Sequence, residues 1–362
     1  MPLSQIECRT VLSRGRREGE AMRFVICGAG AIGGVLGGQL AKAGFAVILI
    51  DTRPEHVAAI NAHGLQLKGV HGTYTLPIPA VLQASAVDFR PDDVIFLAVK
   101  SFHCAAAAAE LRRATTLELP IFCAQNGMVN EGIAARYFQH VNGVMVLIGA
   151  KRLVPGEVVH TGNGPVGIGT YPAGLSQAAQ NVAAALDETD LPVYTTEHIG
   201  RAKWNKLLIN LNNATLGLTG LATQEALAHT AARLWMADVW EEGARVLQAA
   251  GIVYEGPPGM GAIEDRIREL RDGTLPPYVP VDDERAGRTS LWQDLCHRRG
   301  QVEAEDLNGE IVRLGRQYGV PTPYNSLLLD LITELVVARA LPGTYTVQQL
   351  WERIRDEPTP IA

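Results

Sequence analysis

The sequence predicts an α/β fold in which an N-terminal Rossmann-type domain with a parallel sheet precedes an all-helical C-terminal domain. A strand-like run meets a glycine-rich loop at residue 28, strand patterns recur up to about residue 195, and helical patterns follow. A chain of 362 residues is also too long for one typical core. We expect an N-terminal extension (1–21) that is flexible or precedes a true start at Met22, a dinucleotide-binding domain (22–196), a helical substrate and catalytic domain (197–345) and a C-terminal tail with a short helix (346–362).

The first domain is organised around residues 24–51. An apolar run at 24–27 is typical of a buried parallel strand, and a second apolar run at 46–50 ends in Asp51. Between them lie a G-x-G-x-x-G loop and a stretch of helix-compatible composition. This order is that of a dinucleotide-binding unit, in which the glycines allow a tight turn and close approach to a pyrophosphate. The loop residues are Gly28, Ala29, Gly30, Ala31, Ile32 and Gly33.

A membrane span is the alternative for this segment, because residues 24–41 carry no charge and are long enough to cross a bilayer. Seven glycines between residues 28 and 44, together with Lys42, make a poor transmembrane helix. We therefore favour the nucleotide interpretation.

Polar residues follow several of the other predicted strands. Runs at 94–99, 121–124 and 144–148 end near Lys100, Asn126 and Ala150. Ligands of open parallel sheets bind outside the carboxyl ends of the strands, so we expect these residues and Asp51 to lie at a cofactor cleft. A small hairpin is predicted at 65–79 and a β-ribbon at 158–168.

Long helical segments are predicted at 201–217, 229–250, 289–318 and 324–340, with an excursion at 256–280 between helices. The apolar segment 324–340 serves either the core or the interface of a homodimer. The sequence does not decide between them.

Composition excludes several classes of function. An apolar content of 47%, a charged content of 19% and a net charge of −6 are those of an ordinary globular protein and argue against nucleic-acid binding. The five cysteines form no C-x-x-C pair, which indicates buried thiols in a reducing compartment. The nine histidines show no metal-binding spacing. We expect no metal, no nucleic-acid or membrane partner and a cytoplasmic location.

The helix predicted to begin near residue 201 carries the candidate chemistry. Lys206 and Asn210 are four residues apart and share one face, and asparagine is frequent in this helix although it is a poor helix former. The neighbouring apolar residues favour a polar face that lines a cleft. A lysine in such a cleft can polarise a carbonyl and donate a proton, with burial lowering its pKa. Lys203, on a neighbouring face, is the rival.

Several motifs, in order, resemble the ketopantoate reductases (2-dehydropantoate 2-reductases). The resemblance runs from Arg23 to Leu335 and implies a Rossmann domain, a helical domain and an active site between them. It also implies the reduction of a branched 2-keto acid to a D-2-hydroxy acid with NADPH. The matching motifs are GAGAIGG at 28–34, AVKS at 98–101, QNGM at 125–128, KWNKLLIN at 203–210, TSLWQDL at 289–295 and EDLNGEI at 305–311, followed by GVPTP.

The resemblance also implies roles for individual residues. Lys206 would be the proton donor, in place of Lys203, and Asn210 and Ser290 would hold the substrate. Glu303 would bond the ribose on the nicotinamide side and help to order the lysine. Lys100, Asn126 and Ala150 would match cofactor-cleft positions, and the glycine loop would hold the pyrophosphate.

Three departures from the family pattern accompany the match. Ala214 stands where the family often has a second substrate asparagine, and the adjacent Asn213 could replace it only if the helix shifts register. The spacing from Ser290 to Glu303 is one residue longer than expected. Asp51 ends the second strand and favours NADH by bonding a free 2′-hydroxyl, whereas Arg53 could pair with the phosphate of NADPH.

The predicted function is thus an NAD(P)H-dependent reductase of a small 2-keto acid, ketopantoate by resemblance. Reduction of a different 2-keto acid by the same fold is the first alternative. A nucleotide-binding sensor without turnover is the second, although such a sensor would have little use for Lys206, Asn210, Ser290 and Glu303.

Overall fold

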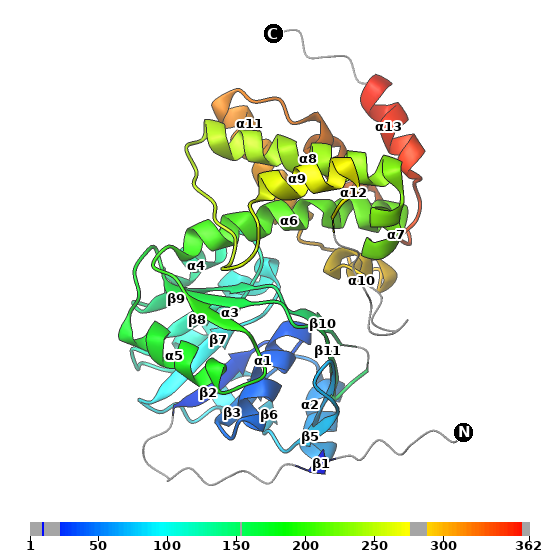
Figure 1. Cartoon of the computed structure of the whole chain (residues 1–362). Helices are drawn as coiled ribbons and strands as arrows, with labels where there is room; N and C mark the ends of the chain where they lie inside the picture. Colours follow the sequence, from blue (N-terminus) through cyan, green and yellow to red (C-terminus); the bar gives the residue numbers. More distant parts are fainter. Residues whose placement is uncertain (1–8, 11–21, 153, 276–287, 357–362) are drawn as a thin grey trace, which may run out of the picture. The chain divides into compact units, whose positions relative to one another are not determined.

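The computed structural model describes residues 9–10, 22–152, 154–275 and 288–356 (Figure 1). The chain divides into two compact units, Met1–Gly200 and Arg201–Ala362, so the boundary falls within helix α6 (Ile199–Thr219). Most of the predicted extension lies outside the described residues, apart from the short strand β1.

Unit 1 contains a large sheet whose central strands are parallel, as the sequence predicts. Only the pairing of β12 with β9 is antiparallel. The N-terminal α/β domain is therefore confirmed. In spatial order the strands are β13 (Val193–Thr195), β12 (Val166–Thr170), β9 (Val141–Val146), β8 (Ile121–Cys123), β7 (Asp93–Leu97), β2 (Arg23–Cys27), β3 (Ala46–Ile50) and β6 (Ala80–Val81).

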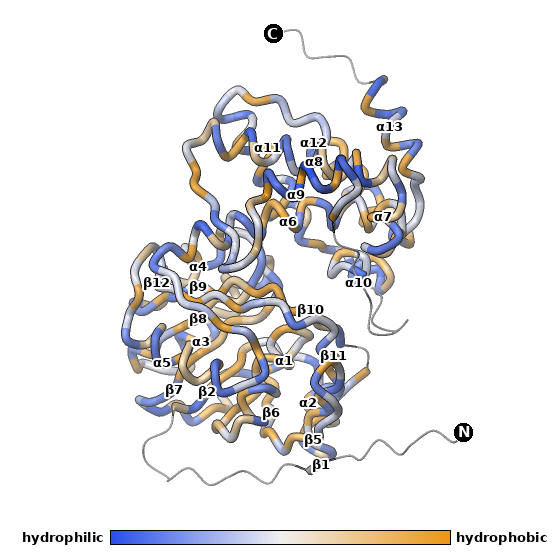
Figure 2. Tube along the Cα trace, viewed as in Figure 1, coloured by the Kyte–Doolittle hydropathy of each residue, from blue (hydrophilic) through white to orange (hydrophobic). Residues whose placement is uncertain are grey.

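The central strands are buried on both faces, which is why they appear in the sequence as continuous apolar runs. Along β2, Phe24 and Ile26 enter one core while Val25 and Cys27 enter the other. The hydropathy of the chain shows the same apolar strands at the centre of unit 1 (Figure 2). Cys27, Cys104 and Cys123 are buried, as predicted, whereas Cys296 is partly exposed. The helices of this unit are α1 (Ala31–Lys42), α2 (Pro54–His63), α3 (Cys104–Ala114), α4 (Asn130–Ala134) and α5 (Gln177–Asp187).

A second, five-stranded sheet corrects two predictions. Its order is β1 (Arg9–Thr10), β5 (Tyr74–Leu76), β4 (Leu65–Gly69), β11 (Glu157–Gly162) and β10 (Gly149–Lys151). The hairpin of β4 and β5 is confirmed. The ribbon predicted at 158–168 is wrong, because β11 pairs with β4 and β10 whereas β12 joins the large sheet. Ala150 belongs to β10 and does not end a parallel strand, because β9 stops at Val146.

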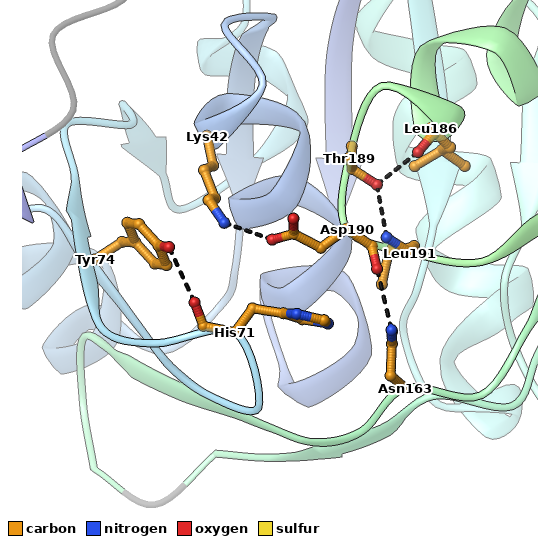
Figure 3. Close-up of polar contacts among 8 residues, drawn as sticks. All are labelled: Lys42, His71, Tyr74, Asn163, Leu186, Thr189, Asp190 and Leu191. Carbon is orange, nitrogen blue, oxygen red and sulfur yellow. Dashed lines mark hydrogen bonds and ion pairs between the residues drawn. The ribbon is translucent and has the colours of Figure 1, made fainter.

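The C-terminal end of α1 is fixed by polar contacts to distant segments (Figure 3). Lys42 forms an ion pair with the carboxylate of Asp190 and lies over the ring of Tyr74. The backbone carbonyl of Asp190 accepts a hydrogen bond from Asn163 Nδ2 at 3.1 Å. These contacts help to fix the axis of α1, whose other end begins at the glycine loop.

The described part of unit 2 is helical, as predicted. The segment predicted as one helical stretch at 289–318 is instead two helices, and the backbone turns at Arg298, whose φ is 48°. The excursion at 256–280 contains a helix of its own, and residues 276–280 lie outside the described part. The helices after α6 are α7 (Thr223–Ala228), α8 (Thr230–Ala249), α9 (Ile263–Asp272), α10 (Ser290–Cys296), α11 (Ala304–Tyr318), α12 (Pro323–Val337) and α13 (Val347–Asp356).

The apolar segment that forms α12 contributes its side chains to the interior of the chain. Leu328, Leu331 and Ile332 are buried, and Pro323 starts the helix where a missing N–H costs nothing. In the part of the chain that the structure describes, no helix combines the length and the apolar composition needed to cross a membrane.

Candidate active site

The glycine loop between β2 and α1 has the geometry of a phosphate cradle. Gly28 has a φ of +101°, and a Cβ there would lie 2.8 Å from the backbone carbon of Ala98. A Cβ on Gly33 would lie 2.0 Å from the carbonyl oxygen of Gly28, so the helix packs against the loop only with glycine at this position. A Cβ on Gly30 would meet no atom within 4 Å. The open space therefore lies at Gly30, where α1 begins.

The first turn of α1 faces this open space with backbone N–H groups. Gly30 is the N-cap residue, and no side chain of the described residues caps the helix there. The first N–H groups of a helix lack partners within it, and together with the helix dipole they favour an anion. The residues present thus fit the pyrophosphate of a dinucleotide.

His56 fixes this loop, and the sequence analysis missed it. The side chain is fully buried, its Nδ1 accepts a hydrogen bond from the Gly156 N–H at 2.9 Å, and its Nε2 therefore donates to the Ala29 carbonyl at 2.8 Å. Burial lowers the pKa of His56, which keeps the imidazole neutral and in this tautomer. A single histidine in the helix after β3 gave no signal of this role.

Asp51 and Arg53 form a bidentate ion pair directly after β3. The guanidinium of Arg53 donates from Nε to Oδ1 at 2.7 Å and from Nη2 to Oδ2 at 2.6 Å, and the Arg53 backbone N–H also donates to Oδ1. Asp51 is 6% exposed. Burial opposes ionisation of the carboxyl, but the hydrogen bonds and charge of Arg53 outweigh it and lower the pKa of Asp51. Asp51 is therefore an ionised carboxylate with a cation already bound to it.

Lys100 and Asn126 follow the adjacent parallel strands β7 and β8. Their loops are tied together, because the carbonyl of Asn126 accepts hydrogen bonds from Ser101 Oγ at 3.1 Å and from Asn130 Nδ2 at 2.7 Å. The parallel strands β3, β2, β7 and β8 are neighbours in the sheet. The glycine loop, Asp51, Lys100 and Asn126 follow these strands and therefore lie together at the carboxyl end of the sheet. Ala150 comes instead from the second sheet, where it pairs with His160.

In unit 2, the predicted polar face of α6 is present. Lys206, Asn210 and Asn213 are spaced by four and three residues, so they lie on one side of the helix. All three are partly exposed, whereas the flanking Leu207, Leu208 and Leu211 are buried. The apolar residues fix the helix in the unit, and the polar face remains accessible.

The electrostatic surroundings of Lys206 favour proton transfer near neutral pH. Burial is the largest cause and the charge of Lys203 adds to it, while Glu303 opposes both, and together they lower the pKa of Lys206 to about 7. Lys203 is 5% exposed and lies three residues away on the same helix. A pKa lowered in this way is a feature of catalytic lysines.

A pocket in unit 2 brings together Asn213, Ser290 and Glu303. The pocket is small, with enclosed room for about one water molecule, and it opens to solvent. Ser290 is the first residue of α10, capped by Thr289, and Glu303 immediately precedes α11. Asn213 and Ala214 both line the pocket, so Asn213 reaches the pocket without a register shift of the helix. The other lining residues are Leu291, Asp294, Ala304, Leu307 and Asn308.

Two family models match most of the chain. One, described as ketopantoate reductase PanE/ApbA, matches residues 24–173, and the other, described as its C-terminal part, matches residues 198–336. A 2-dehydropantoate 2-reductase of Pyrococcus abyssi is 30% identical over 312 residues, which cover 86% of this chain and 97% of the relative. One of Halobacterium salinarum is 28% identical over 317 residues, covering 86% and 98%.

Solved structures agree with these matches. A PanE/ApbA family ketopantoate reductase from Ralstonia eutropha JMP134 aligns with a TM-score of 0.73 and 30% identity, covering 88% of this chain and 99% of that one. A D-mandelate dehydrogenase in a ternary structure with NADH and anilino(oxo)acetate aligns with a TM-score of 0.75 and 25% identity, with the same coverage. The chain therefore belongs to the ketopantoate reductase family and is, as the sequence predicted, an NAD(P)-dependent oxidoreductase.

Proposed function

We propose that the protein reduces a small 2-keto acid to the D-2-hydroxy acid, with ketopantoate as the first candidate substrate and Lys206 as the proton donor. The single observation that carries this proposal is a lysine of pKa about 7 on the same helix face as Asn210 and Asn213. The names of the curated relatives support the choice of substrate.

The cofactor would be held by residues of unit 1. The glycine loop 28–33 and the first turn of α1 would bind the pyrophosphate, and Lys100 and Asn126 would lie beside them at the carboxyl end of the sheet. When bound, the reduced nicotinamide supplies a hydride. The structural relative that carries NADH supports a nicotinamide coenzyme. Ala150, in the second sheet, would contribute backbone and packing only.

The roles in unit 2 follow from the chemistry of the side chains. The ammonium of Lys206 would polarise the keto oxygen of the substrate and donate a proton to the developing alkoxide, a charge that an ammonium stabilises strongly. Asn210, Asn213 and Ser290 would hold the substrate through their amide and hydroxyl groups. Glu303 would bond the nicotinamide-side ribose, and its charge favours the protonated form of Lys206.

The test is the initial rate of NADH and, separately, NADPH oxidation with ketopantoate and with a panel of other 2-keto acids. Turnover that falls about 10²-fold or more in a Lys206→Ala variant supports the proposal. A much higher kcat/KM for another acid would replace ketopantoate as the substrate, an outcome that the likeness to a D-mandelate dehydrogenase makes worth including. Tight coenzyme binding without oxidation by any keto acid would contradict the enzyme and favour a nucleotide sensor.

The rate of reduction should depend on pH through Lys206. The donor must carry its proton, so we expect kcat to be constant below a pKa of about 7 and to fall about tenfold per pH unit above it. A kcat profile from pH 5.5 to 9 checks this, and the keto-acid carboxylate remains ionised throughout that range. A profile that stays flat up to pH 9 would contradict the assignment.

A further inference from the structure

A chain of buried hydrogen bonds crosses unit 2 and ends beside the candidate active site. It begins at Glu242 on α8, which is fully buried, and passes through Asn325 on α12 and Asn308 on α11. It ends at the carbonyl of Leu211 on α6, one residue after Asn210. None of the three buried side chains is assigned to substrate binding or proton transfer in the proposed chemistry, although Asn308 also lines the pocket. Buried polar groups are costly unless paired, so a network of this size needs an explanation.

Glu242 anchors the network at the start of α12. Its Oε1 accepts hydrogen bonds from the Asn325 backbone N–H at 2.8 Å and from Asn325 Nδ2 at 2.7 Å, and its Oε2 accepts from the Tyr324 N–H at 3.0 Å. Burial raises the pKa of Glu242, while these donors and the charge of Arg245 act against that rise. The helix dipole of α12 also favours a carboxylate here. Two hydrogen bonds to this carboxylate therefore set the orientation of Asn325, and the third, from Tyr324, fixes the preceding residue.

Asn308 carries the network from α12 to α6. One hydrogen of its Nδ2 group bonds to Asn325 Oδ1 at 2.9 Å, and the other bonds to the Leu211 carbonyl at 3.1 Å. The side chain is 1% exposed. Both donor positions of the amide are used, which fixes α11 and α6 relative to each other at this point.

We propose that Asn308, oriented by Asn325 and Glu242, is a positioning residue that holds α6 against α11 and so sets the spacing of Lys206 and Glu303. Lys206 lies five residues before Leu211, and Glu303 lies five residues before Asn308. Five residues of helix correspond to a rise of about 7.5 Å, so each side chain lies about that far along its helix axis from the hydrogen bond between Asn308 and Leu211. This inference rests on the proposed function for the roles of Lys206 and Glu303.

Loosening this contact has a defined electrostatic consequence. Burial is the largest cause of the low pKa of Lys206, so water admitted between α6 and α11 should raise that pKa toward its ordinary value. Loss of the effect of Glu303 acts in the opposite direction but is the smallest of the three causes. The orientation of the ammonium should also suffer, and small misplacements of catalytic groups reduce turnover strongly.

The test compares Asn308→Ala with Asn212→Ala. Asn212 is a matched control: it is also buried, and its Nδ2 donates to the Met236 carbonyl at 2.9 Å, which ties α6 to α8 rather than to α11. The fraction of free amine at Lys206 is measured from pH 6 to 10 by competitive acetylation with acetic anhydride and mass spectrometry. The pH dependence of kcat and KM is measured alongside.

In Asn308→Ala we expect the titration midpoint of Lys206 and the falling limb of kcat to move up by about half a pH unit or more, with kcat at pH 7 reduced about tenfold and KM changed less than about threefold. Asn212→Ala should keep the wild-type midpoint. If Asn308→Ala does not fold, Glu242→Gln, which preserves size and lies outside the pocket, should move the midpoint in the same direction by less.

An unchanged midpoint in Asn308→Ala, or an equal shift in Asn212→Ala, would overturn the proposal and leave the network a purely structural one. The acetylation readout does not require turnover. A wild-type protein that reduces no 2-keto acid would therefore overturn the proposed function, while the labelling midpoint would still decide the role of Asn308.

Discussion

Replacing Lys206 with alanine is expected to lower kcat for 2-keto acid reduction by about 10²-fold or more, with little change in coenzyme affinity. A general acid contributes an effect of this size, and electrostatic stabilisation of the alkoxide adds to it. The falling limb of the pH profile above a pKa of about 7 should disappear as well. Stopped-flow single turnovers with coenzyme bound in advance separate this loss from any loss of binding.

Lys203 provides the control for this experiment. Its charge is one cause of the low pKa of Lys206, so Lys203→Ala should move the falling limb to higher pH while turnover on the plateau is retained. The two variants therefore differ in kind: one removes the limb and the other displaces it. Wild-type turnover in Lys206→Ala together with an inactive Lys203→Ala would show that Lys203, and not Lys206, is the proton donor.

The sequence predicted those parts of the fold and the site that depend on local periodicity. The spacing of Lys206 and Asn210 places both on one helix face, and the buried strands follow from their apolar runs. The pocket that joins Asn213, Ser290 and Glu303 depends on the packing of α6, α10 and α11, and it became visible only in the structure. The resemblance to a family, rather than spacing, pointed to Ser290 and Glu303.

The errors have physical reasons. Ala150 was placed at the end of a parallel strand because residues 144–148 continue an apolar run, but β9 ends at Val146 and the chain then passes into the second sheet. Gly300 lies in the break between α10 and α11, but a single glycine is tolerated within a helical pattern and did not mark the break. His56 and Asn308 were missed because a polar residue that is satisfied within a core leaves no pattern in a single sequence.

The second large effect concerns the choice between NADH and NADPH, which the sequence left open. Two N–H donors of the Arg53 guanidinium are already bound to Asp51, and this carboxylate offsets the positive charge that would attract a 2′-phosphate. Binding NADPH would therefore place a second anion beside a buried carboxylate. A 2′-hydroxyl can instead donate to a remaining lone pair of Asp51. We therefore expect the wild-type enzyme to prefer NADH.

Replacing Asp51 with serine should invert this preference. The substitution removes the carboxylate and frees Arg53 to pair with a phosphate, so the ratio of kcat/KM for NADPH to that for NADH should rise about 10²-fold, since a charged hydrogen bond contributes about 1.5–3 kcal/mol. Fluorescence titration of each coenzyme should show the same change in Kd without turnover.

The matched variant Arg53→Gln removes the cation but keeps Asp51. It should weaken the binding of NADPH further, while the binding of NADH changes little. An equal NADPH-to-NADH ratio of kcat/KM in wild type and Asp51→Ser would show that the Asp51–Arg53 pair does not face the coenzyme ribose. Coenzyme binding would then depend on the glycine loop and not on this pair.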